Sequence, residues 1–171
     1  GNVIVRAGGQ VSPGSNIGVV STDVGDVRLL ENAIYIVEIG GAQPGTQYDQ
    51  LSVQGTVDVE GAILSLSGQF RPAAGTKFTL IDNDGNDAVN GRFRSATGAL
   101  LGEGSTVRFG GIEARLSYAD GNAGNDVTLT MTSFQFVMMP SSSSSSSAND
   151  TLQLIFAAAI TEANRRSILI S

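Results

Sequence analysis

The stretch AIYIVEIGGAQPGTQYDQLSVQGTVDVEGAILSLS, residues 33–67, decides how the rest of the chain is interpreted. It contains three short runs in which apolar residues alternate with small or polar ones, at residues 33–39, 49–54 and 62–67. Alternation with a period of two is typical of a β-strand that turns one face to a core. Glycine and proline separate the runs, since glycine readily adopts positive φ and proline cannot continue a strand ladder. The stretch therefore predicts three β-strands joined by tight turns.

The same alternation continues on both sides of this stretch. No amphipathic helix pattern occurs before Ser141, and evenly spaced short strands are typical of a β-solenoid or a β-sandwich. We therefore expect an all-β domain over residues 1–139, with a β-solenoid as the first architecture and a β-sandwich as the alternative. The further strand-like runs cover residues 2–6, 19–22, 26–30, 77–82, 106–109, 112–118 and 126–132.

The composition argues against several classes of protein. The chain of 171 residues has no cysteine and no histidine, which removes thiol catalysis, disulfides, the usual zinc sites and imidazole-activated nucleophiles. Its net charge is -6 and its ten basic residues are scattered, whereas nucleic acid binding needs a concentrated basic surface. No apolar run reaches the length of a membrane span. We therefore expect a protein that is not an enzyme, does not bind nucleic acid and does not span a membrane.

The character of the sequence changes at Pro140. Seven consecutive serines, residues 141–147, predict a flexible linker over residues 140–149. Residues 150–171 then show the spacing of an amphipathic helical tail, which Asn149 or Asp150 would cap. Such a tail could pack on the β-domain or on a neighbouring copy. Its apolar stripe consists of Leu152, Ile155, Phe156, Ala159, Ile160 and Ala163.

An ordered set of short segments resembles a known family. Together these segments are similar to the terminal, passenger-like coils of autotransporter-type, adhesin-like bacterial β-helix proteins. The resemblance covers most of residues 8–132 and does not extend to the serine run or the tail. The segments are VSPGS at 11–15, YIVEI at 35–39, GTQYDQLSVQG at 45–55, GAILSL at 61–66, FTLIDNDG at 78–85, GRF at 91–93 and GNDVTL at 124–129.

The resemblance implies both an architecture and a role. The expected fold is a segment of a right-handed parallel β-helix, or the cap at its end, in a protein that is extracellular or on the bacterial cell surface. The expected function is structural or adhesin-like, with other copies of the chain or neighbouring coils of a longer chain as partners. One alternative is a self-assembling extracellular filament or surface-layer subunit. Another is a module that binds calcium or surface glycans.

Two polar turns are candidate calcium sites. In the first, Asp82, Asp84 and Asn86 place oxygen ligands at alternate positions, as at the start of a calcium loop, although the glycine and glutamate of an EF-hand are misplaced or missing. The second is similar to a single copy of a β-roll calcium nonapeptide, in which Asp120 and Asp126 could share an ion. The competing interpretation is that both segments are polar β-turns without a ligand and that the protein has no cofactor.

A few other side chains deserve comparison with an active site or a glycan surface. Asp49, Asp58 and Glu60 are close in sequence and offer the carboxylates that polysaccharide cleavage would need, but solvated surface residues explain them as well. The three tyrosines form either a sugar-stacking surface or anchors at the edge of the core: Tyr35, Tyr48 and Tyr118. We expect no catalytic residues among them.

Overall fold

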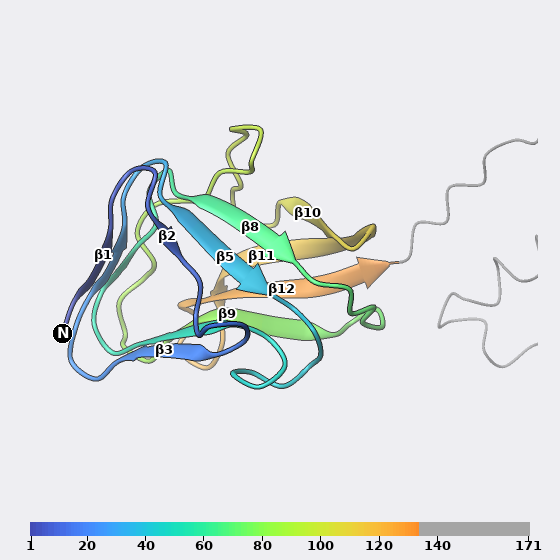
Figure 1. Cartoon of the computed structure of the whole chain (residues 1–171), viewed down its shortest axis with the longest axis horizontal. Helices are drawn as coiled ribbons and strands as arrows, with labels where there is room; N and C mark the ends of the chain where they lie inside the picture. The colour runs from blue at the N-terminus through green and yellow to red at the C-terminus, as the bar shows by residue number, and fades with distance from the viewer. Residues whose placement is uncertain (134–171) are drawn as a thin grey trace, which may run out of the picture. The chain divides into compact units, whose positions relative to one another are not determined.

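The computed structural model describes residues 1–133, which form twelve β-strands and contain no helix (Figure 1). The all-β prediction is therefore confirmed for this part of the chain. The predicted linker at 140–149 and tail at 150–171 lie outside the described residues. The strands are β1 (Val3–Val5), β2 (Gln10–Val11), β3 (Val19–Thr22), β4 (Val27–Leu29), β5 (Ile34–Glu38), β6 (Gln50–Val53), β7 (Val57–Asp58), β8 (Ile63–Ser67), β9 (Lys77–Asn83), β10 (Thr106–Phe109), β11 (Ile112–Asp120) and β12 (Asp126–Ser133).

Each of the first six strands pairs in parallel with the strand three places further along the chain. This pairing gives the orders β1-β4-β7, β2-β5-β8 and β3-β6-β9. Val3, Val27 and Val57 are consequently aligned across one sheet. In Figure 1 the β1 side lies at the left, β2, β5 and β8 run along the upper right, and β3 and β9 lie along the bottom. Strands β1–β9 therefore form three parallel sheets, each with one strand from each successive group of three.

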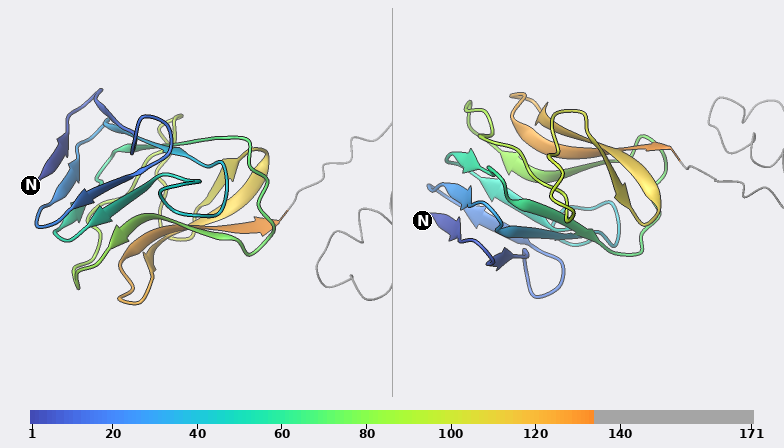
Figure 2. Two further views of the ribbon diagram at one scale, coloured as in Figure 1. Left: turned by 60° about the horizontal axis from the view of Figure 1, so that its bottom comes forward. Right: turned by 90° about the horizontal axis from the view of Figure 1, so that it is seen from above.

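The pairing changes from parallel to antiparallel after β9. β12 pairs antiparallel with β9, β11 with β12, and β10 with β11. The third sheet thereby grows to six strands in the order β10-β11-β12-β9-β6-β3. In the right-hand view of Figure 2 the N-terminal strands lie at one side of the stack and the strands of the antiparallel part lie at the other.

One hydrophobic core joins the parallel and antiparallel parts. Alternate residues of β5 are buried, since Tyr35 and Val37 are fully inaccessible while Ile34 and Ile36 are half-buried, as the period of two predicts. Tyr35 stacks on Phe93 with ring centroids 6.1 Å apart, and Phe93 contacts Tyr118 of β11 at 6.2 Å. Each fully buried large apolar side chain contributes about 1.5–3 kcal/mol, so this shared core stabilises both parts as one unit.

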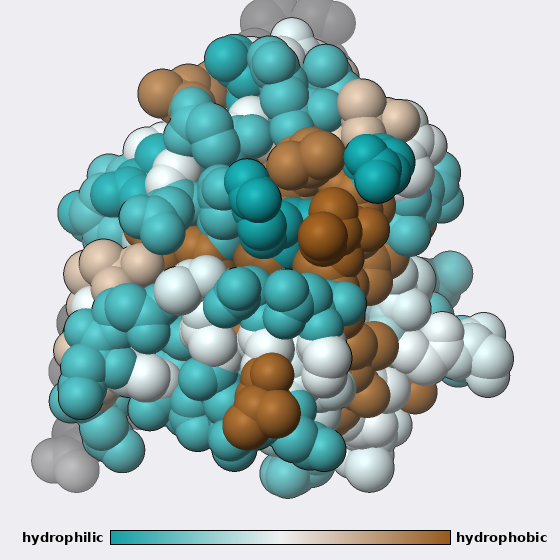
Figure 3. Space-filling view, turned by 90° about the vertical axis from the view of Figure 1, so that its left-hand side faces the viewer, coloured by the Kyte–Doolittle hydropathy of each residue, from teal (hydrophilic) through white to brown (hydrophobic). Residues whose placement is uncertain are grey.

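The two ends of the parallel stack differ. β12 covers β9, and parallel bridges from Asn90 to Asp58 and from Arg94 to Ile63 cover β7 and β8. At the other end, β1, β2 and β3 are the outermost strands of their sheets within residues 1–133. Figure 3 shows the side of the stack on which β1 lies, and not its end; apolar side chains interrupt the polar surface there. Ile4 of β1 and Val19 of β3 are 53% and 43% exposed. We call this end, formed by β1, β2 and β3, the open end.

Candidate functional site

The two predicted calcium turns lie close together because their strands are neighbours. The first turn follows β9 and the second connects β11 to β12, and Ile81 of β9 is the register partner of Val127 of β12. Asp120 and Asp126 are register partners across the second turn. The antiparallel pairing therefore brings acidic residues from distant parts of the sequence to one corner of the third sheet.

Asp120 is held by hydrogen bonds and an ion pair. Lys77 Nζ lies 2.7 Å from one carboxylate oxygen and 2.9 Å from the other, and Thr128 Oγ1 donates to Oδ2 at 2.8 Å. Together with the Gly121 amide, these donors lower the pKa of the Asp120 carboxyl to about 2. Asp120 is therefore an ionised carboxylate whose oxygens already have partners in the chain.

Asp126 occupies a more buried position. Its Oδ1 accepts a hydrogen bond of 3.0 Å from the backbone amide of Asn83. Burial raises the pKa of the Asp126 carboxyl above its usual range, the bond from Asn83 opposes this, and the negative charges of Asp82 and Asp120 raise the pKa further. The negative charges of Asp82 and Asp120, two of the predicted ligands, therefore act on a third, Asp126.

The remaining predicted ligands are separate from this group. Asp84 and Asn86 are exposed in the turn after β9, and the Asp84 amide donates to Val53 O at 3.0 Å. Within residues 1–133 no group of three or more acidic, histidine or cysteine side chains is arranged to hold a metal ion. The calcium prediction for these particular residues stays a prediction.

Sequence inspection missed three residues of the same two turns. Asn83, Asp87 and Asn125 direct their side chains inward, and Asn83 and Asn125 are only 2% exposed. Polar residues in a turn are ordinarily expected to face solvent, so their burial had no sequence signal beyond the unusual density of Asn and Asp.

The carboxylates considered for catalysis have structural partners. Asp49 is fully buried, and its two oxygens accept hydrogen bonds of 2.9 Å from the amides of Gly18 and Glu38. Burial raises the pKa of the Asp49 carboxyl, and the two amide bonds oppose this effect. Asp58 lies 3.7 Å from the guanidinium of Arg28 and accepts a hydrogen bond from the Glu60 amide. Asp49 thus joins three segments of the chain, whereas Asp58 belongs to the surface of β7.

The three tyrosines are buried and do not form a sugar-stacking surface. Tyr35, Tyr48 and Tyr118 are 0%, 4% and 4% exposed. The Tyr118 hydroxyl donates to Leu101 O at 2.7 Å and accepts from the Phe93 amide at 3.0 Å. Burial is the main cause that raises the pKa of Tyr118 to about 12. The interpretation as core anchors is therefore confirmed.

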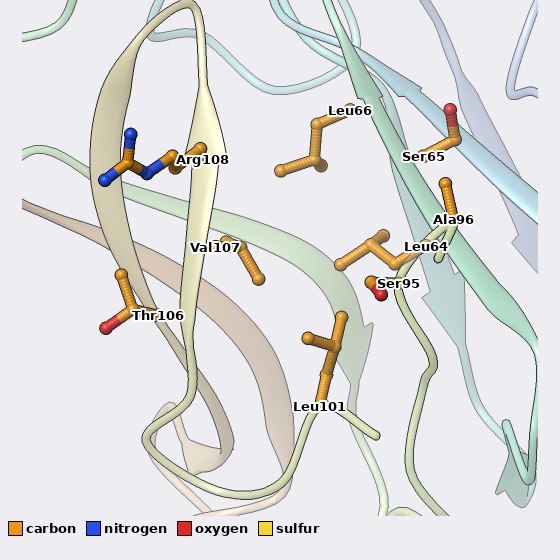
Figure 4. A pocket seen from close by; sticks show the side chains of 9 residues that line it. All are labelled: Leu64, Ser65, Leu66, Ser95, Ala96, Leu101, Thr106, Val107 and Arg108. Carbon is orange, nitrogen blue, oxygen red and sulfur yellow. The ribbon is translucent and has the colours of Figure 1, made fainter. Parts of the chain in front are cut away.

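A hollow of about 330 Å³ lies between the edge strands β8 and β10. Figure 4 shows Leu64 and Leu66 of β8 facing Val107 of β10 across it. The hollow therefore brings apolar, hydroxyl and guanidinium groups together without a carboxylate. The remaining residues of its lining are Ser65, Ser95, Ala96, Leu101, Thr106 and Arg108.

No family model, curated protein or solved structure matches this chain. The described residues contain no helix long and apolar enough to cross a membrane.

Proposed function

We propose that this chain is a structural, adhesin-like module of an extracellular or bacterial cell-surface protein, formed by the terminal coils of a right-handed parallel β-helix. The observation that best supports this role is the contrast between the two ends of the parallel stack. One end is covered by β12 and by the segment around Asn90 and Arg94, whereas at the other no strand of residues 1–133 pairs with the outer edges of β1, β2 and β3. Such an arrangement suits the last coils of a stack that continues at its open end.

The physical basis of this role is the burial of apolar surface between coils. A single coil cannot bury its own apolar face, so stacked coils share one core and form a rigid body. The resulting module would hold a surface protein in an extended shape or present its outer faces for adhesion. It needs no catalytic group, and we propose that it has none.

The open end carries backbone groups suited to another coil. The Val3 amide donates to Asp26 O and Val5 O accepts from the Leu30 amide, so both residues direct their polar groups toward β4. Because these groups alternate along a strand, those of Ile4 face outward. In β3, Gly18 O accepts a hydrogen bond from the Gln50 amide of β6. The backbone groups of the next residue, Val19, therefore face outward as well. An edge of this kind pairs readily with a further strand.

The neighbour at this end is either another coil of a longer chain or a second copy of this one. A single open end joins two copies into a closed pair, whereas a filament needs two complementary surfaces on each copy. The open end by itself therefore favours the structural module over the filament or surface-layer subunit.

The test is the association state of the full chain in solution, measured by sedimentation equilibrium over a range of concentrations. We expect a concentration-dependent pair in the unaltered chain and single chains in the double variant Ile4→Lys/Val19→Lys, because charges on edge strands oppose pairing. Leu100→Lys is the matched control, since Leu100 is 59% exposed and lies outside the open end. Single chains at every concentration, or equal weakening by the control, would contradict the proposal.

A further inference from the structure

The end of β9 and the start of β12 enclose a cluster of polar side chains. Asn83 is the last residue of β9, and Asn125 directly precedes β12. The turn at 84–87 passes close to both, because β9 and β12 are antiparallel partners at this end. Side chains that are far apart in the sequence are thereby buried together.

The amide groups of the two asparagines are fixed by carbonyl oxygens of the turn. Asn125 Nδ2 donates to Gly85 O at 2.7 Å and to Asp87 O at 3.1 Å, and Asn83 Nδ2 donates to Asp87 O at 2.8 Å. Rotating either amide by half a turn would place its oxygen against a carbonyl oxygen. The orientation of both side chains is therefore determined by these donors.

Three side-chain oxygens of the cluster are left without a partner. Asn83 Oδ1, Asn125 Oδ1 and Asp87 Oδ2 are inaccessible to solvent and accept no hydrogen bond from the described residues. A buried acceptor that is left unsatisfied destabilises the fold, because it has lost its hydrogen bonds to water. Three of them within one pair of turns indicate that something else satisfies them.

The chemistry of these oxygens selects a cation. All three are acceptors, one belongs to a carboxylate, and a water molecule can donate only two hydrogen bonds. Amide and carboxylate oxygens are the ligands that calcium prefers. The Asp82 and Asp126 carboxylates nearby add negative charge, which favours a cation in the same corner, whereas the charge of Asp120 is paired with Lys77.

We propose that one calcium ion binds between the two turns, with Asn83 Oδ1, Asn125 Oδ1 and Asp87 Oδ2 as ligands. The ion fastens the turn after β9 to the start of β12, so it locks the junction between the parallel and antiparallel parts. These ligands differ from the oxygens of Asp82, Asp84, Asn86, Asp120 and Asp126 that the sequence suggested on the same turns. The site is independent of the open end, because it lies where β12 covers the stack.

The experiment is calcium titration of the full chain, freed of metal with a chelator, by isothermal calorimetry and by thermal unfolding. We expect a single site with a dissociation constant on the order of 10⁻⁴–10⁻³ M, the range of weak extracellular sites, and a higher melting temperature with calcium. Asp87→Asn should weaken binding at least about tenfold, the loss typical of altered groups around a metal ligand. Asp84→Asn removes the same charge from an exposed position of the same turn and should bind as the unaltered chain does.

The outcomes are distinguishable. An unaltered chain that shows neither heat nor a melting shift up to 10 mM calcium, a concentration about tenfold above the weakest expected constant, would overturn the proposal whatever the variants do. Equal weakening by both variants would assign the binding to general surface charge and would overturn it too. Circular dichroism of each variant verifies that the fold is retained, and asparagine has nearly the shape of aspartate.

Discussion

At the scale of single residues, buried polar groups connect segments that are far apart in the sequence. The Tyr35 hydroxyl donates a hydrogen bond to Leu80 O at 2.7 Å, and the Asp49 carboxylate accepts hydrogen bonds from the backbone amides of Gly18 and Glu38. A buried polar group is tolerated only when it is hydrogen-bonded, so each such contact fixes one arrangement of the chain. These residues act as structural anchors and explain why the corresponding sequence positions are aromatic or acidic.

Tyr118 provides the sharpest test at this scale. Its hydroxyl satisfies both Leu101 O and the Phe93 amide inside the core. Tyr118→Phe keeps the ring but leaves both groups unpaired, so we expect the free energy of unfolding to fall by about 1–3 kcal/mol. Tyr48→Phe is the control, because that hydroxyl accepts a longer bond of 3.3 Å from Thr79. Urea unfolding of both variants measures the difference, and an unchanged Tyr118→Phe protein would contradict this assignment.

Individual side-chain roles were only partly predictable. The sequence indicated that the tyrosines are either surface or core, and burial decides between the two. It did not indicate that Asn83 and Asn125 face inward, because both lie in turns and their neighbours come from another strand. Burial depends on pairing between distant segments, which local patterns of polarity do not encode.

At the scale of elements, the alternating pattern predicted most strands closely. The expected runs at 19–22 and 106–109 coincide with β3 and β10. The two-residue strands β2 and β7 were not predicted, since two residues are too few to show a period. Residues around Asn90 and Arg94 form only isolated bridges, although their composition resembles a strand.

One glycine tests how tightly adjacent coils pack. Gly68 follows β8 with φ at 118°, and a Cβ placed there would collide with the backbone oxygen of Ile39. Gly75 also has positive φ, at 84°, but has nothing within 4 Å of such a Cβ. We expect Gly68→Ala to lose about 1–3 kcal/mol more stability than Gly75→Ala, because only the former adds a steric clash to the backbone strain. Thermal unfolding of the two variants gives the comparison, and equal losses would mean that the coils are not in such close contact at Gly68.

At the scale of the whole molecule, the change from parallel to antiparallel pairing is what the sequence could not reveal. Strands before and after β9 alternate in the same way, because the period reports one buried face and not the direction of the neighbouring strand. The junction at β12 follows from that unpredicted change. The even spacing of short runs bounded by glycine therefore predicted the all-β class, and the sequence also indicated the two polar turns, but not which of their side chains are buried.

The proposed function depends on the parallel pairing of strands three places apart. Since the chain has no cysteine, paired cysteines introduced at register partners report the pairing directly. Arg28 and Asp58 are such partners on β4 and β7, and their side chains reach the surface. Neighbouring strands lie about 4.8 Å apart, within the span of a disulfide, whereas Ile4 and Asp58 are separated by two such spacings.

The most direct measurement is therefore disulfide formation in the folded chain, followed by mass spectrometry under mild oxidation. We expect a complete intramolecular disulfide in Arg28→Cys/Asp58→Cys and none in Ile4→Cys/Asp58→Cys. The reverse result, or a first pair that stays reduced while the protein remains folded, would contradict the parallel stack.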